Sequence, residues 1–217
     1  MRTVHLLACG VGLALSASAM GAPVDIGFAR VTPANAPQNP AAQFKAVLSE
    51  VSSSVVRFRF TNTAVIYCSI SEIYYDNRNS APLSSLMTPL NQFGATFTGG
   101  GANPGNLPGG QNLSPAFSAT AVFSADAQGN PANGLDTAAD WLEMDFVLGA
   151  GKTFNSVVDA IANGDLRIGL HVRAIGTSGD SDSFVNGNPP NVIPLPPAAL
   201  AGLAGLAGVA VLRRRRV

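Results

Sequence analysis

The sequence predicts an all-β domain, an antiparallel β-sandwich of the jelly-roll type with one short helix, flanked by a hydrophobic segment at each end. Several short segments alternate apolar and polar residues, which is the period of a strand with one buried face. Loops rich in Gly, Pro and Asn separate them, and the chain has 23 Gly and 15 Pro among 217 residues. Only one segment has clear helical periodicity, so antiparallel strands must supply most of the core.

The first half of the domain contains three predicted strands. Val24–Arg30 can start the sheet, after which residues 33–40 form a turn-rich link. Residues 54–60 alternate Val and Phe with Arg, and residues 64–75 form a second β-rich run. Because only the polar residues 61–63 separate these two runs, we expect them to pair as an antiparallel hairpin.

The second half continues the same pattern. Residues 94–98 predict a short strand and residues 99–112 a Gly-rich loop. Residues 116–125 alternate, which predicts another strand. Trp141–Leu148 and Leu166–Ile175 alternate most clearly, so we expect both to lie with one face in the core.

One helix is expected over residues 155–162. Thr153 or Asn155 can cap its start, and Asn163-Gly164 supplies the usual stop signal. Residues 176–188 are mostly polar, and we interpret them as a tail that leaves the domain.

The N-terminus has the three parts of a secretory signal peptide. Arg2 provides the positive charge, residues 6–15 the apolar core, and Ala17-Ser18-Ala19 a cleavage site before Met20. A second cut before Ala22 remains open. We therefore expect export.

The C-terminus combines a proline motif, a short apolar run and a basic end. Residues 193–197 read Ile-Pro-Leu-Pro-Pro, residues 198–212 are apolar, and four arginines follow before the final Val217. Fifteen helical residues cover about 22 Å, less than the roughly 30 Å hydrocarbon core. Such a segment can insert transiently, with the arginines held on the cytoplasmic side.

This tail resembles the PEP-CTERM class of bacterial sorting signals, in its V-P-L-P-A-like variant. Ile193, Pro194, Leu195 and Pro196 stand where that class usually has Val-Pro-Glu-Pro, and Arg213, Arg214, Arg215 and Arg216 form its basic end. The resemblance implies recognition by an exosortase, a membrane cysteine protease-transpeptidase, in a Gram-negative cell that makes extracellular polysaccharide. The alternative is a plain C-terminal membrane anchor.

These signals divide the chain into a signal peptide at residues 1–21, a β-sandwich domain at 22–188 and a sorting signal at 189–217. The expected location is the cell surface, outer membrane or extracellular matrix, after transient insertion in the inner membrane. Extracellular polysaccharide or other surface proteins are the partners that this location offers.

Charge and cysteine content narrow the choice of function. The central domain has eight basic and 13 acidic side chains, a net charge near −5, which argues against nucleic acid and anionic lipid as partners. Cys9 leaves with the signal peptide, so Cys68 remains alone and no intramolecular disulfide can form. A single Cys in a strand-like run is more typical of a buried side chain than of a nucleophile.

Acidic residues gather around the single tryptophan. Asp136 and Asp140 precede Trp141, and Glu143 and Asp145 follow it on one strand face. Asp136 and Asp140 are candidates for a Ca²⁺ site, because carboxylates beside an Asn/Gly loop supply the oxygen ligands that Ca²⁺ prefers. Trp141, Glu143 and Asp145 are candidates for sugar binding, and two carboxylates about 7 Å apart also suit a glycosidase. A solvated strand face with ordinary acidic side chains explains the same pattern.

No catalytic constellation emerges, so the leading hypothesis is a non-enzymatic exported protein with a structural or adhesive role. A carbohydrate-binding module is the first alternative, with Trp141 or the tyrosines 67, 74 and 75 as its aromatic surface and Ca²⁺ as an optional cofactor. An extracellular glycoside hydrolase is the second.

Overall fold

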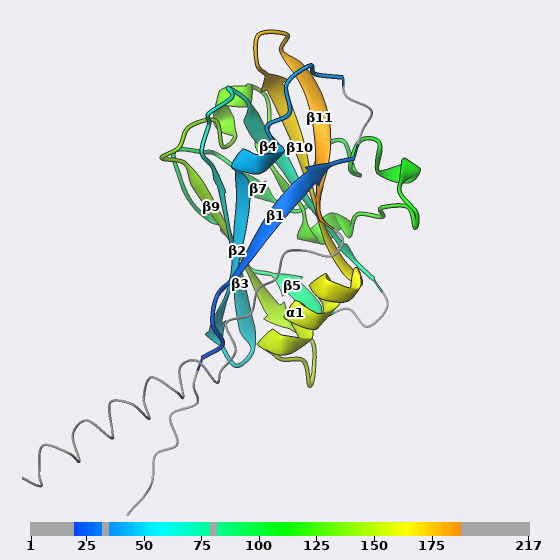
Figure 1. Cartoon of the computed structure of the whole chain (residues 1–217). Helices are drawn as coiled ribbons and strands as arrows, with labels where there is room; N and C mark the ends of the chain where they lie inside the picture. The colour runs from blue at the N-terminus through cyan, green and yellow to red at the C-terminus, as the bar shows by residue number, and fades with distance from the viewer. Residues whose placement is uncertain (1–19, 32–34, 79–81, 188–217) are drawn as a thin grey trace, which may run out of the picture.

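The computed structural model describes residues 20–31, 35–78 and 82–187 (Figure 1). The cleavage site after Ala19, the proline motif at 193–196 and the basic end at 213–216 lie outside these ranges. Within the described ranges, no helix has the length and apolar character needed to cross a membrane.

The described residues form one continuous antiparallel sheet that is nearly barrel-shaped (Figure 1). Its order is β5-β9-β3-β2-β1-β11-β10-β4-β8-β7, and β6 also pairs with β9. The eleven strands are β1 Val24–Arg30, β2 Phe44–Ser52, β3 Val55–Asn62, β4 Ser69–Asn77, β5 Leu83–Leu86, β6 Asn91–Phe93, β7 Thr98–Gly99, β8 Ala125–Asp126, β9 Trp141–Leu148, β10 Leu166–Ile175 and β11 Asp180–Asn186. The all-β prediction is confirmed.

The two ends of the sheet approach each other. A Cβ on Gly99 of β7 would lie 3.0 Å from Thr88 Cγ2 and 3.2 Å from the Leu86 side chain, at the end of β5. The short 3₁₀ turn η3, Ala121–Phe123, also contacts β5. These contacts bring the opposite ends of the sheet together around one apolar core.

Strands with strict alternation have the predicted bounds and faces. β1, β9 and β10 begin and end where the sequence pattern places them. In β9, Leu142, Met144 and Phe146 are fully buried, as expected for one face in the core. β10 departs from alternating burial at Gly169, which lies under Leu107 and Phe117, and at its end, where Ala174 has a φ of 56° and Ile175 turns inward.

The predicted hairpin between residues 54–60 and 64–75 is wrong. β3 pairs with β2 and β9, whereas β4 pairs with β10 and β8. The true hairpin partner, β2, was not predicted, although Phe44, Ala46 and Leu48 alternate in its sequence and are buried. Pairing depends on contacts across the barrel, which separation along the chain does not reveal.

Two further segments differ from expectation. Residues 116–125 contain η3 and the start of the two-residue strand β8 instead of one strand, because this segment crosses over the sheet and Phe117 packs outside it. Residues 176–188 are not a tail, since β11 lies between β1 and β10 in the middle of the sheet. Its polar sequence is accommodated because Asp182 is ion-paired with Arg30.

The predicted helix is present as α1, Phe154–Asn163, and covers one end of the barrel (Figure 1). Thr153 is its N-cap and forms a capping box with Ser156. Gly164 ends the helix in the left-handed conformation, with a φ of 76°. Val157 and Ile161 point into the core, so the helix supplies apolar side chains where the strands end.

Candidate functional site: an aromatic and charged platform outside the sheet

The predicted sugar-binding residues lie on the outer face of β9. Alternation along this strand turns Trp141, Glu143 and Asp145 away from the core. Neighbouring strands add partners by register: β6 places Phe93 opposite Trp141 and Asn91 opposite Glu143, and β3 places Arg59 opposite Glu143 and Arg57 opposite Asp145. The outer platform consists of these seven side chains: Arg57, Arg59, Asn91, Phe93, Trp141, Glu143 and Asp145.

Aromatic surface forms one end of the outer platform. The rings of Phe93 and Trp141 are stacked, with centroids 6.5 Å apart and an angle of 16° between their planes. The Arg59 guanidinium lies 4.2 Å from the centre of the Trp141 ring, a cation–π contact. Phe93 remains 59% exposed, which is unusual for an aromatic side chain of a folded domain. The platform therefore presents apolar ring surface beside a cation.

Glu143 is the centre of the charged end. One carboxylate oxygen accepts from Arg59 at 2.7 Å, and the other accepts from Asn91 Nδ2 at 2.7 Å and is ion-paired with Arg57 at 3.0 Å. Its side chain is only 8% exposed. Three donors on two neighbouring strands thus hold this carboxylate in one position.

Asp145 forms a two-point pair with Arg57. The Nε and Nη2 groups donate to the two carboxylate oxygens at 2.7 and 2.8 Å. The hydrogen bond with Asp145 raises the pKa of Arg57, against the opposing effect of desolvation. Both Glu143 and Asp145 thus accept hydrogen bonds from guanidinium groups of β3.

Asp136 and Asp140, the candidate metal ligands, shape the turn before β9. Asp140 Oδ2 accepts hydrogen bonds from the backbone N–H groups of Asp136 at 3.1 Å and Thr137 at 2.7 Å. Desolvation, followed by the hydrogen bond and repulsion from Asp140, raises the pKa of Asp136. Across the described ranges, no three His, Cys, Asp or Glu side chains are grouped so that they could hold a metal ion.

The tyrosines do not form a second platform. Tyr74 and Tyr75 are fully buried, and the Tyr74 hydroxyl donates to Pro104 O at 2.8 Å. Tyr67 is 53% exposed in the connection between β3 and β4. Exposed aromatic surface on paired strands is therefore provided by Phe93 and Trp141.

Sequence reasoning found part of the platform. The outward direction of Arg57, Arg59 and the three β9 residues follows from alternation. Asn91 and Phe93 were missed, because β6 has only three residues and its pattern is too short to predict a strand. The pairing of β6 with β9 is what brings Phe93 to the tryptophan.

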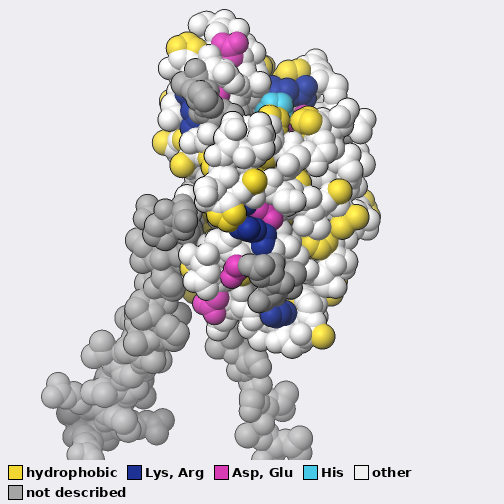
Figure 2. All heavy atoms as spheres, turned by 90° about the vertical axis from the view of Figure 1, so that its right-hand side faces the viewer, with side chains coloured by type: hydrophobic (Ala, Val, Ile, Leu, Met, Phe, Trp, Pro, Cys, Tyr) yellow, Lys and Arg dark blue, Asp and Glu magenta, His cyan; other side chains and the backbone are white. Residues whose placement is uncertain are grey.

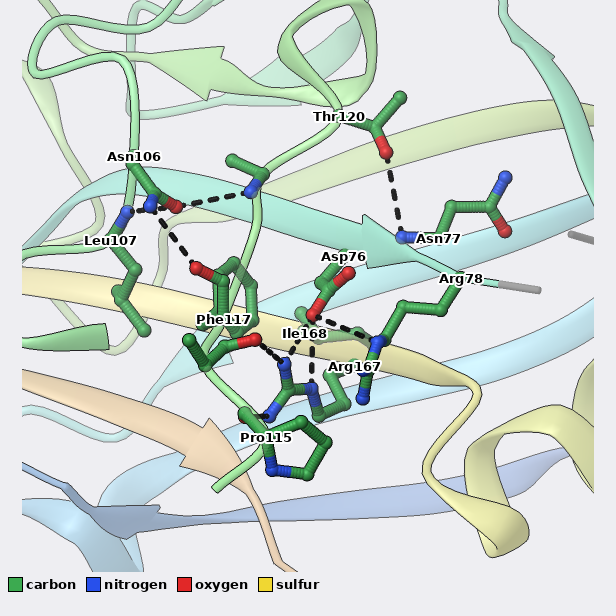
Figure 3. A network of polar contacts seen from close by, with 12 residues as sticks. Asp76, Asn77, Arg78, Asn106, Leu107, Pro115, Phe117, Thr120, Arg167 and Ile168 are labelled. Atoms are coloured by element: carbon green, nitrogen blue, oxygen red, sulfur yellow. Dashed lines mark hydrogen bonds and ion pairs between the residues drawn. The ribbon is translucent and has the colours of Figure 1, made fainter. Parts of the chain in front are cut away.

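The opposite wall of the barrel has its outer face covered by the 100–120 loop. Figure 3 shows Arg167 of β10 between Asp76 of β4 and this loop. Arg167 Nη1 donates to Pro115 O at 2.8 Å and Nη2 to Ala116 O at 2.6 Å. Asn106 fixes the loop to itself by donating to Phe117 O at 3.1 Å (Figure 3). We interpret this network as a fastening of the loop.

The fastened loop covers a small second apolar cluster on the sheet. Its buried members are Tyr74, Ala102, Leu107, Phe117 and Val185. A cavity of about 300 Å³ lies beside it, between the loop and the end of α1. Arg78 and Arg167 contribute to its wall, but Arg167 is already occupied by Asp76 and the loop carbonyls.

Comparison with protein-family models, with curated proteins and with solved structures finds no match for this chain.

Proposed function

We propose that this is an exported protein of the bacterial cell surface or extracellular matrix, sorted by an exosortase-type protease and serving a structural or adhesive role. The observation that carries the proposal is the order of the C-terminal features: the Ile193–Pro196 motif, the apolar run 198–212 and Arg213–Arg216. The signal-peptide pattern at the other end supports it, since export must precede sorting. The jelly-roll form of the β-domain is part of the same proposal.

The side of β4 that faces away from β10 is closed to strand addition. The outer side of β4 is hydrogen-bonded along its length by the segment 120–135: Thr120 N–H donates to Tyr75 O, Ala127 N–H to Ser71 O, and Leu135 N–H to Ile70 O. β4 therefore offers no free ladder for another chain. Contact with a matrix on this wall would then use exposed side chains.

The sorting proposal is tested by intact mass of the protein recovered from its native cell surface. The wild-type chain should lack the segment from about Pro194 onward. Replacing Pro194 and Pro196 together by Ala should block processing, because the rigid spacing that the protease reads is lost. That variant should keep Arg213–Arg216.

The matched control replaces Pro189 and Pro190, which precede the motif, by Ala and should be processed normally. Normal surface delivery and cleavage of the Pro194/Pro196 variant would contradict the proposal. So would a wild-type mass that retains the four arginines, since the chain would then be a membrane-anchored protein.

A second function, carbohydrate binding, is favoured by the outer platform. Sugar rings stack on exposed aromatic side chains through their apolar faces, and Phe93 and Trp141 present such a surface beside Arg59 and Asn91. The charged end is rigid because its groups hold one another, so a bound sugar would meet preorganised donors.

Retention on the native extracellular polysaccharide tests this function. Phe93→Ala should reduce retention about fivefold or more, since stacking on an aromatic ring contributes on the order of 1 kcal/mol or more. Tyr67→Ala removes an equally exposed aromatic side chain elsewhere and should leave retention unchanged. EDTA should have no effect, because the platform carboxylates are occupied by guanidinium groups. Equal retention of Phe93→Ala and wild type would rule the platform out.

A further inference from the structure

A polar cavity of about 360 Å³ opens on the wall of the barrel formed by β10, β4 and β8, apart from the outer platform. Its lining residues are Glu72, Asn103, Asp126, Gln128, Gly129 and Arg173. Figure 2 faces this side of the molecule and shows a histidine side chain at the surface with basic and acidic groups beside it. His171 is the histidine within the described ranges, and it contacts the cavity residue Glu72.

Two carboxylates face each other at the base of the cavity. Glu72 of β4 and Asp126 of β8 are directly opposite in the sheet, and they are only 3% and 4% exposed. Like charges in this relation destabilise a sheet, and burial increases the cost. The arrangement therefore needs positive charge or hydrogen-bond donors close by.

Residues of β10 supply Glu72 with a hydrogen-bond donor and a positive charge. His171 Nδ1 lies 2.6 Å from Glu72 Oε2, so we assign the ring proton to Nδ1. Arg173 Nε is 3.8 Å from Oε1. The rest of the Arg173 guanidinium donates to Gly129 O at 3.2 Å and Ala127 O at 3.3 Å, which holds the turn at the rim.

Asp126 has fewer hydrogen-bond partners than Glu72. Its Oδ2 accepts the backbone N–H of Asn103 at 2.9 Å. From the residues that the structure describes, Oδ1 accepts no hydrogen bond, although the side chain is almost completely buried and lines the cavity. Asp126 therefore keeps an unused acceptor at the cavity that it lines, where a ligand can supply a donor.

We propose that this cavity binds a small ligand carrying a primary ammonium group, such as an amino sugar. Glu72 has His171 and Arg173 beside it, whereas Asp126 has no ion-pair partner among the described residues, and an ammonium group would balance its charge. Its three donors suit Asp126 Oδ1 and the Glu72 carboxylate. Asn103 and Gln128 also line the cavity, and their side-chain amides can both donate to and accept from hydroxyl groups of the remaining ligand.

A divalent metal ion fits less well. The guanidinium of Arg173 stands against the same carboxylate that would have to ligate the ion. A monovalent ammonium group needs only directed acceptors, which Glu72 and Asp126 supply.

Titration of the full mature chain with glucosamine, followed by calorimetry and by the amide NMR signals of Asn103 and Gln128, tests the proposal. Glucose is the matched probe, because it has the same ring without the ammonium group. Glucosamine should bind saturably and at least about tenfold more tightly than glucose. Equal affinity for the two sugars, or no saturable change with glucosamine, would overturn the proposal.

Variants locate the site. Asp126→Asn keeps the acceptor for Asn103 N–H but removes the charge, and it should weaken glucosamine binding about tenfold or more. Asp25→Asn changes an exposed carboxylate elsewhere and should have no effect. If Asp126→Asn shows no cooperative thermal unfolding transition, it is not folded, and Glu72→Gln is used in its place. Unchanged binding in a folded Asp126 or Glu72 variant, or Ca²⁺ binding that displaces glucosamine, would refute the assignment.

Discussion

Asp182 on β11 and Arg30 on β1 form an ion pair at 3.1 Å, and the Asp182 side chain is inaccessible to solvent. The same carboxylate accepts the backbone N–H groups of Asn35 and Ala36, each at 3.2 Å. A buried charge persists only where partners on neighbouring segments satisfy it. The burial of a single charged residue in this domain thus depends on its partners on neighbouring strands and loops.

Removing the Asp182 carboxylate should strongly destabilise the domain. Asp182→Ala leaves the Arg30 charge and two backbone donors without their acceptor, so the free energy of unfolding should fall by about 3–5 kcal/mol. Urea denaturation followed by circular dichroism measures it. As a control, Asp25→Ala breaks the exposed pair with Lys45 and should cost less than about 1 kcal/mol. Similar losses in the two variants would contradict this account.

The buried Cys68 thiol should lower the free energy of unfolding at alkaline pH. Burial raises its pKa from 9.0 to about 11, and the hydrogen bonds from Asn62 and Gln43 only partly oppose this effect. Above pH 9.0 the unfolded chain loses this proton before the folded chain does. The resulting contribution to stability is intact below that pH, declines as pH rises, and stops changing above about 11.

Unfolding free energies of wild type and Cys68→Ala, measured by urea denaturation between about pH 8 and pH 10.5, test this effect. Wild type should lose more stability than the variant over this range, by up to about 1.4 kcal/mol per pH unit. The comparison is needed because burial also raises the pKa of Tyr74 and Tyr75 in both proteins. Parallel curves would show that the thiol is not buried as described.

At the scale of elements, some strands and helices follow their own sequence pattern, whereas others are decided by their tertiary environment. α1 and β9 match the sequence because their apolar spacing reports one buried face. β11 does not, because it lies inside the sheet and is buried despite its polar residues. An element is predictable from sequence when its own pattern explains its burial.

The cap of α1 should contribute measurably to stability. Thr153→Ala removes the hydroxyl that accepts from Ser156 N–H at 3.3 Å, and the unfolding free energy should fall by about 1 kcal/mol. Thr153→Ser retains a capping hydroxyl and should stay within about 0.5 kcal/mol of wild type. A loss in the Ser variant as large as in the Ala variant would show that packing of the methyl group, and not the cap, is responsible.

At the scale of the whole molecule, the sheet is a scaffold with different outer walls. One wall carries the outer platform on β6, β9 and β3, and the other carries the fastened 100–120 loop and the polar cavity beside β4. The proposed sorting signal is separate from both in sequence. The Pro194/Pro196 variant should therefore melt like wild type while its processing fails, which separates delivery from folding.

The sequence by itself determined the all-β class, the bounds of β1, β9 and β10, the position of α1 to within one residue at each end, and the outward direction of Trp141, Glu143 and Asp145. These follow from local alternation, which each strand carries in its own residues. Tertiary structure alone decided the partners: β2 beside β3, β11 inside the sheet, and Phe93 against Trp141. Pairing and charge compensation join residues that are distant along the chain, so the physical cause of these features lies in contacts that a single linear pattern does not contain.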